Sequence, residues 1–350
     1  MKSKLYTVLQ LAAVYVGTIV GAGLASGQEI TQFFTIYGYK SFYGILLCCF
    51  LYIFFSSIII NLTVELKLKS YKDLIKTVSP NFLGEVTDFV TSLFLICGTG
   101  IILAGSGSML SQYFHMSKLI GVLLMCILSS IVLLRNTQGL FEVNSIIVPC
   151  LLIIIVTIFI LYISFSSDTQ NIKSLITVPN IKSNWFFSTL LYASFNILGS
   201  SGVLVPISSE NKNVKTLITG VIIGAVVLTI LAGIINYMLL LNMPSSIKYE
   251  IPLLYISNRF GVLIQVLLLI VIWFEMFSTC ISDIYSVAKA LEQKTSVSYS
   301  TAMVIIIFMA LPISQFGFVK LISFLYPAFG FISLFFLIKC VFFYYRNFLR

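Results

Sequence analysis

A row of polar side chains in an otherwise apolar segment, at about 262–292, could bind a cation. Its members are spaced three, four and seven residues apart, which places them on one broad face of a helix. They are Glu275, Ser278, Thr279, Ser282, Asp283 and Ser286. Hard cations such as Na⁺ take oxygen ligands, and carboxylates at membrane depth are costly enough to indicate function. We therefore assign ion coupling to Ser278, Thr279, Ser282, Glu275 and Asp283.

Structural alternatives for these polar residues stay open. Serine and threonine in membrane helices often donate a hydrogen bond to the carbonyl of the preceding turn. Asp283 could lie in water near the cytoplasmic mouth of a pathway. Glu29, which we include in the ion-coupling set, could titrate during transport, or it could cap a helix start where the helix dipole favours a carboxylate.

If such an ion accompanies a solute, the part of the chain expected to position that solute is a glycine-rich stretch at 17–29. It reads Gly-Thr-Ile-Val-Gly-Ala-Gly-Leu-Ala-Ser-Gly-Gln-Glu, and its glycines make it the least helix-favouring part of the first apolar segment. The stretch is either a packing face that lets another helix come close, or a broken helix whose freed backbone binds a solute. In the second case the candidate solute ligands are Gly21, Ala22, Gly23, Leu24 and Ser26.

A second glycine-containing stretch, Phe-Asn-Ile-Leu-Gly-Ser-Ser-Gly at 195–202, lies in the sixth apolar segment and is followed by Pro206. Paired interruptions in the first segment of each half are a pointer to a transporter binding site, and they favour the broken-helix interpretation. Unwound N–H and C=O groups suit a zwitterion. Packing is the alternative for these small residues. The further candidate ligands are Asn196, Gly199, Ser200 and Ser201, with Thr99 of the third segment.

The composition excludes an ordinary soluble domain. Of 350 residues, 59% are hydrophobic and 9% are charged, and the mean hydropathy is +1.06, which indicates a polytopic α-helical membrane protein. The net charge of +9 reflects lysines between apolar segments, notably at 67–76, so we predict no nucleic-acid partner. Seven cysteines without a Cys-x-x-Cys pair and one histidine, His115, predict neither a metal site nor a disulfide framework.

About ten membrane segments are predicted. Their approximate ranges are 5–36, 42–66, 84–114, 117–134, 140–165, 185–209, 214–242, 262–292, 298–314 and 317–346. A short amphipathic segment at about 250–260 is expected at the membrane interface. With the N-terminus inside, lysine and arginine favour the inner side by roughly two to one, so we expect both termini in the cytoplasm and the chain in the cell membrane.

The segments divide five and five about a polar connection. We expect a first five-helix repeat at 1–165, an extracellular connection at 166–184 and a second repeat at 185–350. Because five is odd, a duplicated unit must insert the second time upside down, as is typical of secondary transporters. The predicted fold class is an all-α polytopic membrane protein with ten helices in a 5+5 inverted repeat, whose first and sixth helices are broken.

The glycine stretch, together with Phe33 and Phe34, resembles that of the YkvI-type bacterial membrane proteins. These are members of the amino acid–polyamine–organocation superfamily, which shares the leucine-transporter five-plus-five fold. The resemblance extends over essentially the whole chain in segment number and in the positions of the breaks. It implies a solute site between Gly21–Ser26 and Gly199–Gly202, walled by the third and eighth segments.

The same resemblance implies a way of coupling to an ion. Sodium-coupled members bind Na⁺ with adjacent hydroxyl residues midway along the eighth segment, and Ser278 and Thr279 match that pattern. Some proton-coupled members carry a lysine in the fifth segment instead. No lysine occurs between Arg135 and Lys173, which favours Na⁺ and leaves a carboxylate-based proton route open.

The predicted function is secondary active transport of a small organic solute, an amino acid or related amine, by alternating access coupled to Na⁺ or H⁺. The partners are then the solute, the coupling cation and the lipid bilayer, with no cofactor except Na⁺ as coupling ion. The sequence contains no catalytic triad or phosphate-binding loop, so we expect no enzyme. The alternative is a transporter-like receptor that senses a small nutrient without net transport.

Overall fold

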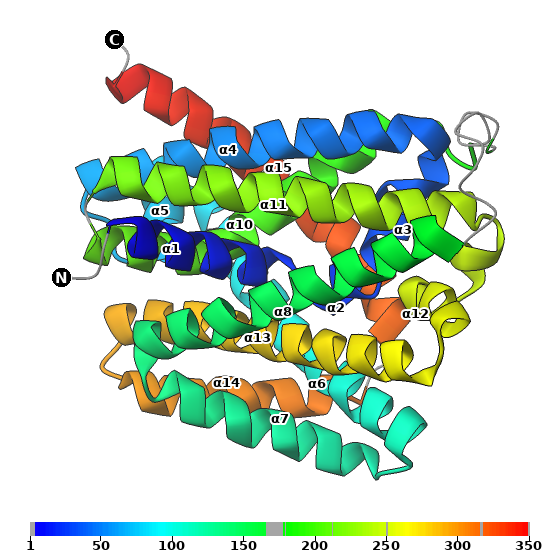
Figure 1. Cartoon of the computed structure of the whole chain (residues 1–350). Coiled ribbons are helices and arrows are strands. Elements are labelled where there is room, and N and C mark those ends of the chain that lie inside the picture. The colour runs from blue at the N-terminus through cyan, green and yellow to red at the C-terminus, as the bar shows by residue number, and fades with distance from the viewer. Residues whose placement is uncertain are drawn as a thin grey trace.

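The computed structural model describes residues 4–165, 178, 180–211, 213–249, 251–315 and 318–348, and these form an array of long helices (Figure 1). The first half contains α1 (Lys4–Ile19), α2 (Ala22–Ala25), α3 (Gln28–Phe33), α4 (Ser41–Glu65), α5 (Tyr71–Val78), α6 (Phe82–Phe114), α7 (Lys118–Leu133) and α8 (Asn136–Phe165). The second half contains α10 (Trp185–Glu210), α11 (Val214–Leu241), α12 (Pro252–Ser257), α13 (Val262–Lys294), α14 (Tyr299–Ile313) and α15 (Phe318–Phe348).

Several of these helices are long and apolar enough to cross a membrane. Within the described residues there are seven such helices, and three shorter apolar helices accompany them at Leu5–Ile19, Lys118–Leu133 and Tyr299–Ile313. Large apolar side chains on the outside of the array, such as Phe50, Ile153 and Phe308, are more than half exposed. A surface of this kind is stable in lipid rather than in water. The chain is therefore a multi-pass membrane protein with the predicted ten segments.

The packing of the helices repeats between the two halves. The first helix of each half packs on the second helix of the other half, so α1 lies on α11 and α10 lies on α4. The third and fourth helices pair in both halves, as α6 with α7 and α13 with α14. This exchange is what an inverted repeat requires. It produces two groups, which we call the bundle (α1–α4, α10 and α11) and the scaffold (α6, α7, α13 and α14).

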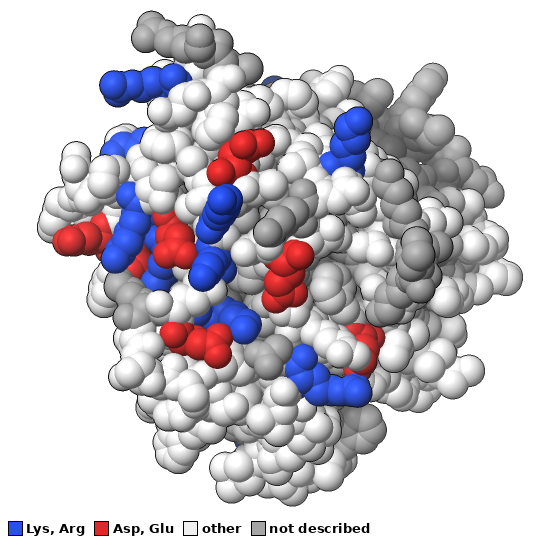
Figure 2. All heavy atoms as spheres, turned by 90° about the vertical axis from the view of Figure 1, so that its left-hand side faces the viewer, with Lys and Arg blue, Asp and Glu red and all other residues white. Residues whose placement is uncertain are grey.

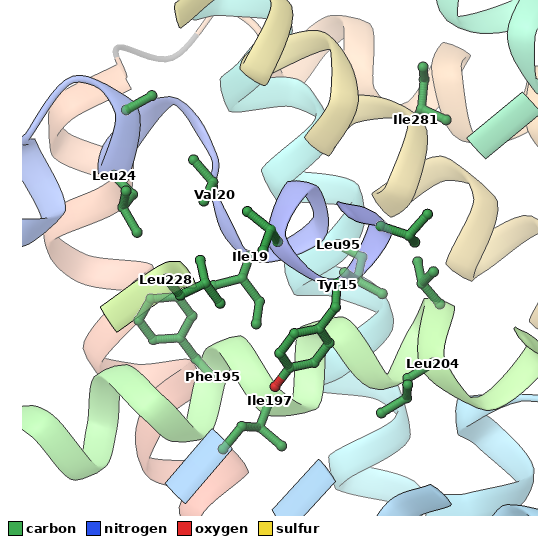
Figure 3. Packing of buried hydrophobic residues seen from close by; sticks show 14 of the residues in the cluster. Tyr15, Ile19, Val20, Leu24, Leu95, Phe195, Ile197, Leu204, Leu228 and Ile281 are labelled. Atoms are coloured by element: carbon green, nitrogen blue, oxygen red, sulfur yellow. The ribbon is translucent and has the colours of Figure 1, made fainter. Parts of the chain in front are cut away.

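The first helix is broken, as the sequence predicts. Helix α1 ends at Ile19, the single turn α2 follows, and Gly27 then adopts a φ of 82° before α3 begins. The left-handed conformation at Gly27 is one that glycine tolerates and other residues rarely adopt. Apolar side chains on both sides of the break, Ile19, Val20 and Leu24, are buried among residues of α10 and its neighbours (Figure 3). The break is thus held inside the protein and away from lipid.

The sixth helix differs from the prediction. Helix α10 is one continuous α-helix from Trp185 to Glu210, with no interruption at Gly199–Gly202. Ser200 and Ser201 donate to carbonyls of the same helix, Ile197 O at 3.0 Å and Leu198 O at 2.6 Å. A Cβ at Gly202 would collide with Ser286 of α13. Gly202 therefore serves close helix packing, which the helix achieves without unwinding.

A short helix outside the ten segments closes one side of the first break. Helix α12 lies within the predicted amphipathic segment, and most of its side chains are buried. The backbone N–H of Leu253 donates to Ser26 O at 3.0 Å. The side chain of Leu253 packs against Gly27, where an added Cβ would lie 3.2 Å from Leu253 Cγ. A carbonyl freed by the interruption is thereby satisfied from outside the helix.

Charged side chains gather at one end of the array, the end that carries the start of α1, helix α5 and the turn between α13 and α14 (Figures 1 and 2). The predicted inner cluster at 67–76 lies at this end, in the turn after α4 and in most of α5. An excess of lysine and arginine on one side is typical of the cytoplasmic face. Most of the predicted extracellular connection at 166–184 lies outside the described residues, so the repeat boundaries stay a prediction.

The orientation can be tested by thiol labelling of a variant without its native cysteines. We expect an impermeant maleimide added to sealed cells to label Lys118→Cys, at the exposed start of α7, and to leave Lys69→Cys unlabelled. Both thiols should react after the membrane is permeabilised, which controls for accessibility. Labelling of Lys69→Cys alone in sealed cells would reverse the orientation.

Candidate functional site

A cavity lies beside the first break, between the bundle and the scaffold. It has an empty volume of about 520 Å³, including its open mouth. Polar and small residues in its wall are Thr18, Gly21, Glu29, Gly98, Asn196, Gly199, Ser200, Thr279 and Asp283. The apolar wall is Ile19, Phe94, Leu95, Ile102, Phe195 and Tyr326. A wall that mixes polar and apolar groups is typical of sites for small organic molecules.

A cluster of oxygen atoms adjoins this cavity where α1 ends. Ser278 Oγ donates to Gly17 O at 3.1 Å, and Thr279 Oγ1 donates to Val20 O at 3.1 Å. Ser278 Oγ also contacts Asn144 Oδ1 of α8 at 2.6 Å. We call these five atoms, Gly17 O, Val20 O, Ser278 Oγ, Thr279 Oγ1 and Asn144 Oδ1, the oxygen cluster. It joins α1 of the bundle to α13 of the scaffold and to α8.

Local structure explains why the oxygen cluster forms. The last carbonyls of α1 lack partners within the helix because the helix stops at Ile19. The amide of Asn144 is oriented by a hydrogen bond from its Nδ2 to Leu140 O at 2.9 Å, which leaves Oδ1 facing Ser278. A Cβ at Gly17 would collide with that amide and lie 2.9 Å from Ser278 Oγ. Glycine at position 17 is therefore what lets the three helices meet.

The oxygen cluster fits a monovalent hard cation. All five atoms are neutral carbonyl, amide or hydroxyl oxygens, the ligand type that such cations prefer. The two hydroxyl groups can rotate so that their lone pairs face a bound ion. Thr279 belongs to the cluster and also lines the cavity, so an ion and a solute would be neighbours.

Two predicted ion-coupling carboxylates lie in the cavity wall instead of the oxygen cluster. Glu29 is 3% exposed, and its Oε2 has no hydrogen-bond partner within the described part of the chain. Asp283 lines the same cavity from α13. Glu275 is fully buried outside the cavity lining, and neither of its carboxylate oxygens has a partner within the described residues.

The predicted solute ligands separate into two sets. Gly21, Asn196, Gly199 and Ser200 line the cavity. Gly23, Leu24, Ser26, Thr99 and Ser201 lie outside its lining. Leu24 lines a separate apolar pocket with Tyr192 and Leu228.

Hydroxyl groups outside the cavity lining donate to carbonyls of their own segments, and one of them, Ser282, also contacts another helix. Ser26 Oγ donates to Gly23 O at 3.1 Å, and Thr99 Oγ1 donates to Leu95 O at 3.0 Å. Ser201 bonds within α10, as described above. Ser282 Oγ donates to Ser278 O at 3.0 Å and lies 3.4 Å from Thr18 Oγ1. The structural alternative raised for such hydroxyls holds for these four, while the side chain of Ala22 lies outside the described set.

Several site residues escape sequence reasoning. Asn144 is a buried amide in an apolar segment, a signal that was available in the sequence. Thr18 gives no such signal, because a threonine in a membrane helix is ordinary, and the glycines beside Thr99, including Gly98, predict only close helix packing. Tyr326, next to Pro327, marks a helix kink in the sequence, yet its ring lines the cavity.

Comparison with solved structures defines the class of fold. MhsT in complex with L-phenylalanine matches with a TM-score of 0.68 at 14% identity, covering 96% of this chain and 88% of that one. The nucleobase-cation-symport-1 transporter Mhp1 matches with 0.64 at 12%, covering 96% and 78%. A Na⁺-coupled sialic acid symporter matches with 0.66 at 14%, covering 96% and 74%. The chain has the leucine-transporter fold, and these neighbours are transporters rather than enzymes.

Comparison with curated sequences defines the family. The membrane protein YkvI of Bacillus subtilis (strain 168) is 32% identical over 330 residues, which are 94% of this chain and 93% of that protein. YyaD of the same organism is 24% identical over 322 residues, 92% of each chain. No family model matches. The chain belongs to the YkvI family of membrane proteins, as the glycine stretch suggested.

The close approach at Gly17 makes a stability prediction. Gly17→Ala should lower the stability of the folded protein by about 1–3 kcal/mol, because the added methyl group overpacks the junction of α1, α8 and α13. Thermal unfolding of the purified protein in detergent measures the change. Gly233→Ala in α11 is the matched control, since its Cβ would meet nothing within 4 Å. Equal unfolding temperatures for the two variants would contradict the packing role of Gly17.

Proposed function

We propose that this protein is a secondary transporter that moves a small organic solute by alternating access, coupled to Na⁺. The observation that carries the proposal is the oxygen cluster, which adjoins the cavity and shares Thr279 with it. A cation bound there lies against the wall of the solute site. The fold supports the same conclusion, because the transporters that share it include the Na⁺-coupled sialic acid symporter.

The choice of Na⁺ over H⁺ follows from the chemistry of the ligands. Carbonyl, amide and hydroxyl oxygens do not take up a proton near neutral pH, whereas they coordinate a hard cation well. The fifth membrane helix offers the Asn144 amide to this cluster and no lysine side chain. A proton carried by Glu29, Glu275 or Asp283 is the competing route.

Coupling follows from where the oxygen cluster lies. Gly17 and Val20 belong to the bundle, and Ser278 and Thr279 belong to the scaffold. An ion that binds all four stabilises the arrangement in which the two groups are close at this point. Since the solute cavity lies between the same two groups, ion and solute stabilise a common state, and each raises the affinity of the other.

The solute would occupy the space between α2 and α10. Gly21 presents backbone to it, Asn196 presents an amide, and Gly199 leaves room, since a Cβ there would meet nothing within 4 Å. These groups support an amino acid or a related amine as solute, and the neighbour MhsT is seen with L-phenylalanine. In this proposal the protein lies in the cell membrane with both termini in the cytoplasm.

The test is ion dependence of uptake in proteoliposomes. Uptake from a panel of labelled amino acids and amines should rise with an inward Na⁺ gradient. The double variant Ser278→Ala/Thr279→Ala should raise the Na⁺ concentration for half-maximal uptake by about ten- to hundred-fold, because two oxygen ligands are lost. Ser130→Ala/Thr157→Ala is the matched control, because these hydroxyls bond to carbonyls of their own helices at 2.7 Å.

The outcomes separate the alternatives. Uptake that follows a pH gradient and ignores Na⁺ would overturn the ion site and move coupling to the carboxylates. Solute binding without uptake under any gradient would favour the receptor that the sequence left open. An unchanged Na⁺ dependence in the double variant would show that the oxygen cluster is structural.

A further inference from the structure

The charges of the cavity wall point to the kind of solute that it binds. Two carboxylates, Glu29 and Asp283, line the cavity, and none of its described lining residues is lysine, arginine or histidine. Resting on the transport function proposed above, we propose that the solute is an organic cation, an amine or guanidine that carries no carboxylate. Glu29 and Asp283 then bind the cationic nitrogen atoms of the solute rather than the coupling ion.

The state of Glu29 is the first support. A carboxylate that is removed from water loses a large hydration energy unless a charge or hydrogen-bond donor replaces it. Glu29 is only 3% exposed, and although the Tyr192 hydroxyl neighbours its carboxyl group, the Oε2 atom has no hydrogen-bond partner in the described part of the chain. An ammonium group in the cavity would supply the missing donor and the missing charge. The buried carboxylate is therefore an acceptor that the solute completes.

Each carboxylate is seated against a glycine. A Cβ at Gly23 would collide with the carboxyl group of Glu29, and a Cβ at Gly98 would lie 2.8 Å from Asp283 Oδ2. The glycine in the first break thus makes room for an acidic side chain. The same arrangement recurs on α6 opposite α13, where Gly98 leaves space for Asp283. At both positions the carboxyl group occupies space that a side chain at the glycine position would fill.

The two carboxylates of the cavity wall come from different groups of helices. Glu29 belongs to α3 of the bundle and Asp283 to α13 of the scaffold. A solute with a cationic nitrogen at each end would therefore bridge the two groups of helices. This position links binding to the relative movement that alternating access requires.

Aromatic rings form the rest of the wall and suit the same chemistry. The ring centroids of Phe195 and Tyr326 are 4.8 Å apart, and those of Phe94 and Tyr326 are 5.6 Å apart. All three rings line the cavity. The faces of aromatic rings attract ammonium and guanidinium groups, and their area packs against a methylene chain. A solute carboxylate would instead meet two like charges and no described cationic side chain.

The first test compares three probes that share one carbon skeleton on the purified wild-type protein in Na⁺ buffer. These are 1,4-diaminobutane, ornithine, which adds a carboxylate to it, and 1,4-butanediol, which replaces both ammonium groups with hydroxyls. By calorimetry, 1,4-diaminobutane should bind at least about tenfold more tightly than ornithine, because like charges oppose the added carboxylate. We expect no binding of the diol.

The second test removes the charges in the protein. Glu29→Gln and Asp283→Asn should each weaken 1,4-diaminobutane binding by about ten- to hundred-fold, the effect of losing one charged partner. Glu85→Gln is the control, because that carboxylate lies in the first turn of α6 and is exposed. Gly23→Ala should weaken binding without changing any charge, and Gly233→Ala should not. Unfolding temperatures identify variants that fail to fold. If a variant fails to fold, the comparison of the three probes on the wild-type protein decides whether the solute is an organic cation.

The outcomes are distinct from those of the transport experiment. Tighter binding of ornithine than of 1,4-diaminobutane, or binding of the diol at a comparable level, would overturn the organic-cation assignment. So would unchanged affinity in the two folded carboxylate variants. Na⁺-driven uptake of a zwitterionic amino acid would support the transport function and reject the organic cation as solute. Binding of the diamine without uptake would support the organic cation as ligand and reject the transport function.

Discussion

The arrangement of this protein depends on the polar backbone that the first helix leaves unsatisfied between Ile19 and Gln28. Inside a membrane no water is present to bond such groups, so protein must do it. Ser278 and Thr279 donate to the carbonyls at the end of α1, and the Leu253 N–H donates to Ser26 O. The helices that supply these donors are thereby drawn against the break. The same partly satisfied oxygens are what an ion can bind.

The inverted repeat explains how a chain can hold such a break in its interior. The first helix of each half packs on the second helix of the other, which places α1 and α10 at the centre with α4 and α11 behind them. The scaffold packs on the opposite side of the break. A cavity left between two groups that are each well packed can open and close as the groups move, while the interior of each group stays intact.

The two halves use their glycines differently. In the first half, Gly17 and Gly23 make room for polar side chains, Asn144 with Ser278 in one case and Glu29 in the other. In the second half, Gly202 makes room for Ser286 within a continuous helix. The two halves thus arrange their helices in the same way, but only the first half has a broken first helix. The cavity is accordingly bounded by a broken backbone on one side and an intact helix on the other.

The sequence alone determined the membrane class, the ten segments, the first break, and the adjacent hydroxyls at 278 and 279. These features depend on local composition and on spacing along one helix, which a sequence displays directly. It misjudged α10, because glycine and serine permit both unwinding and close packing, and the neighbouring helix decides between them. Asn144 joined the oxygen cluster, and Asp283 joined Glu29 in one cavity, only through the tertiary structure. Those pairings lie more than a hundred residues apart, so the packing of α8 and α13 against the first break decided them.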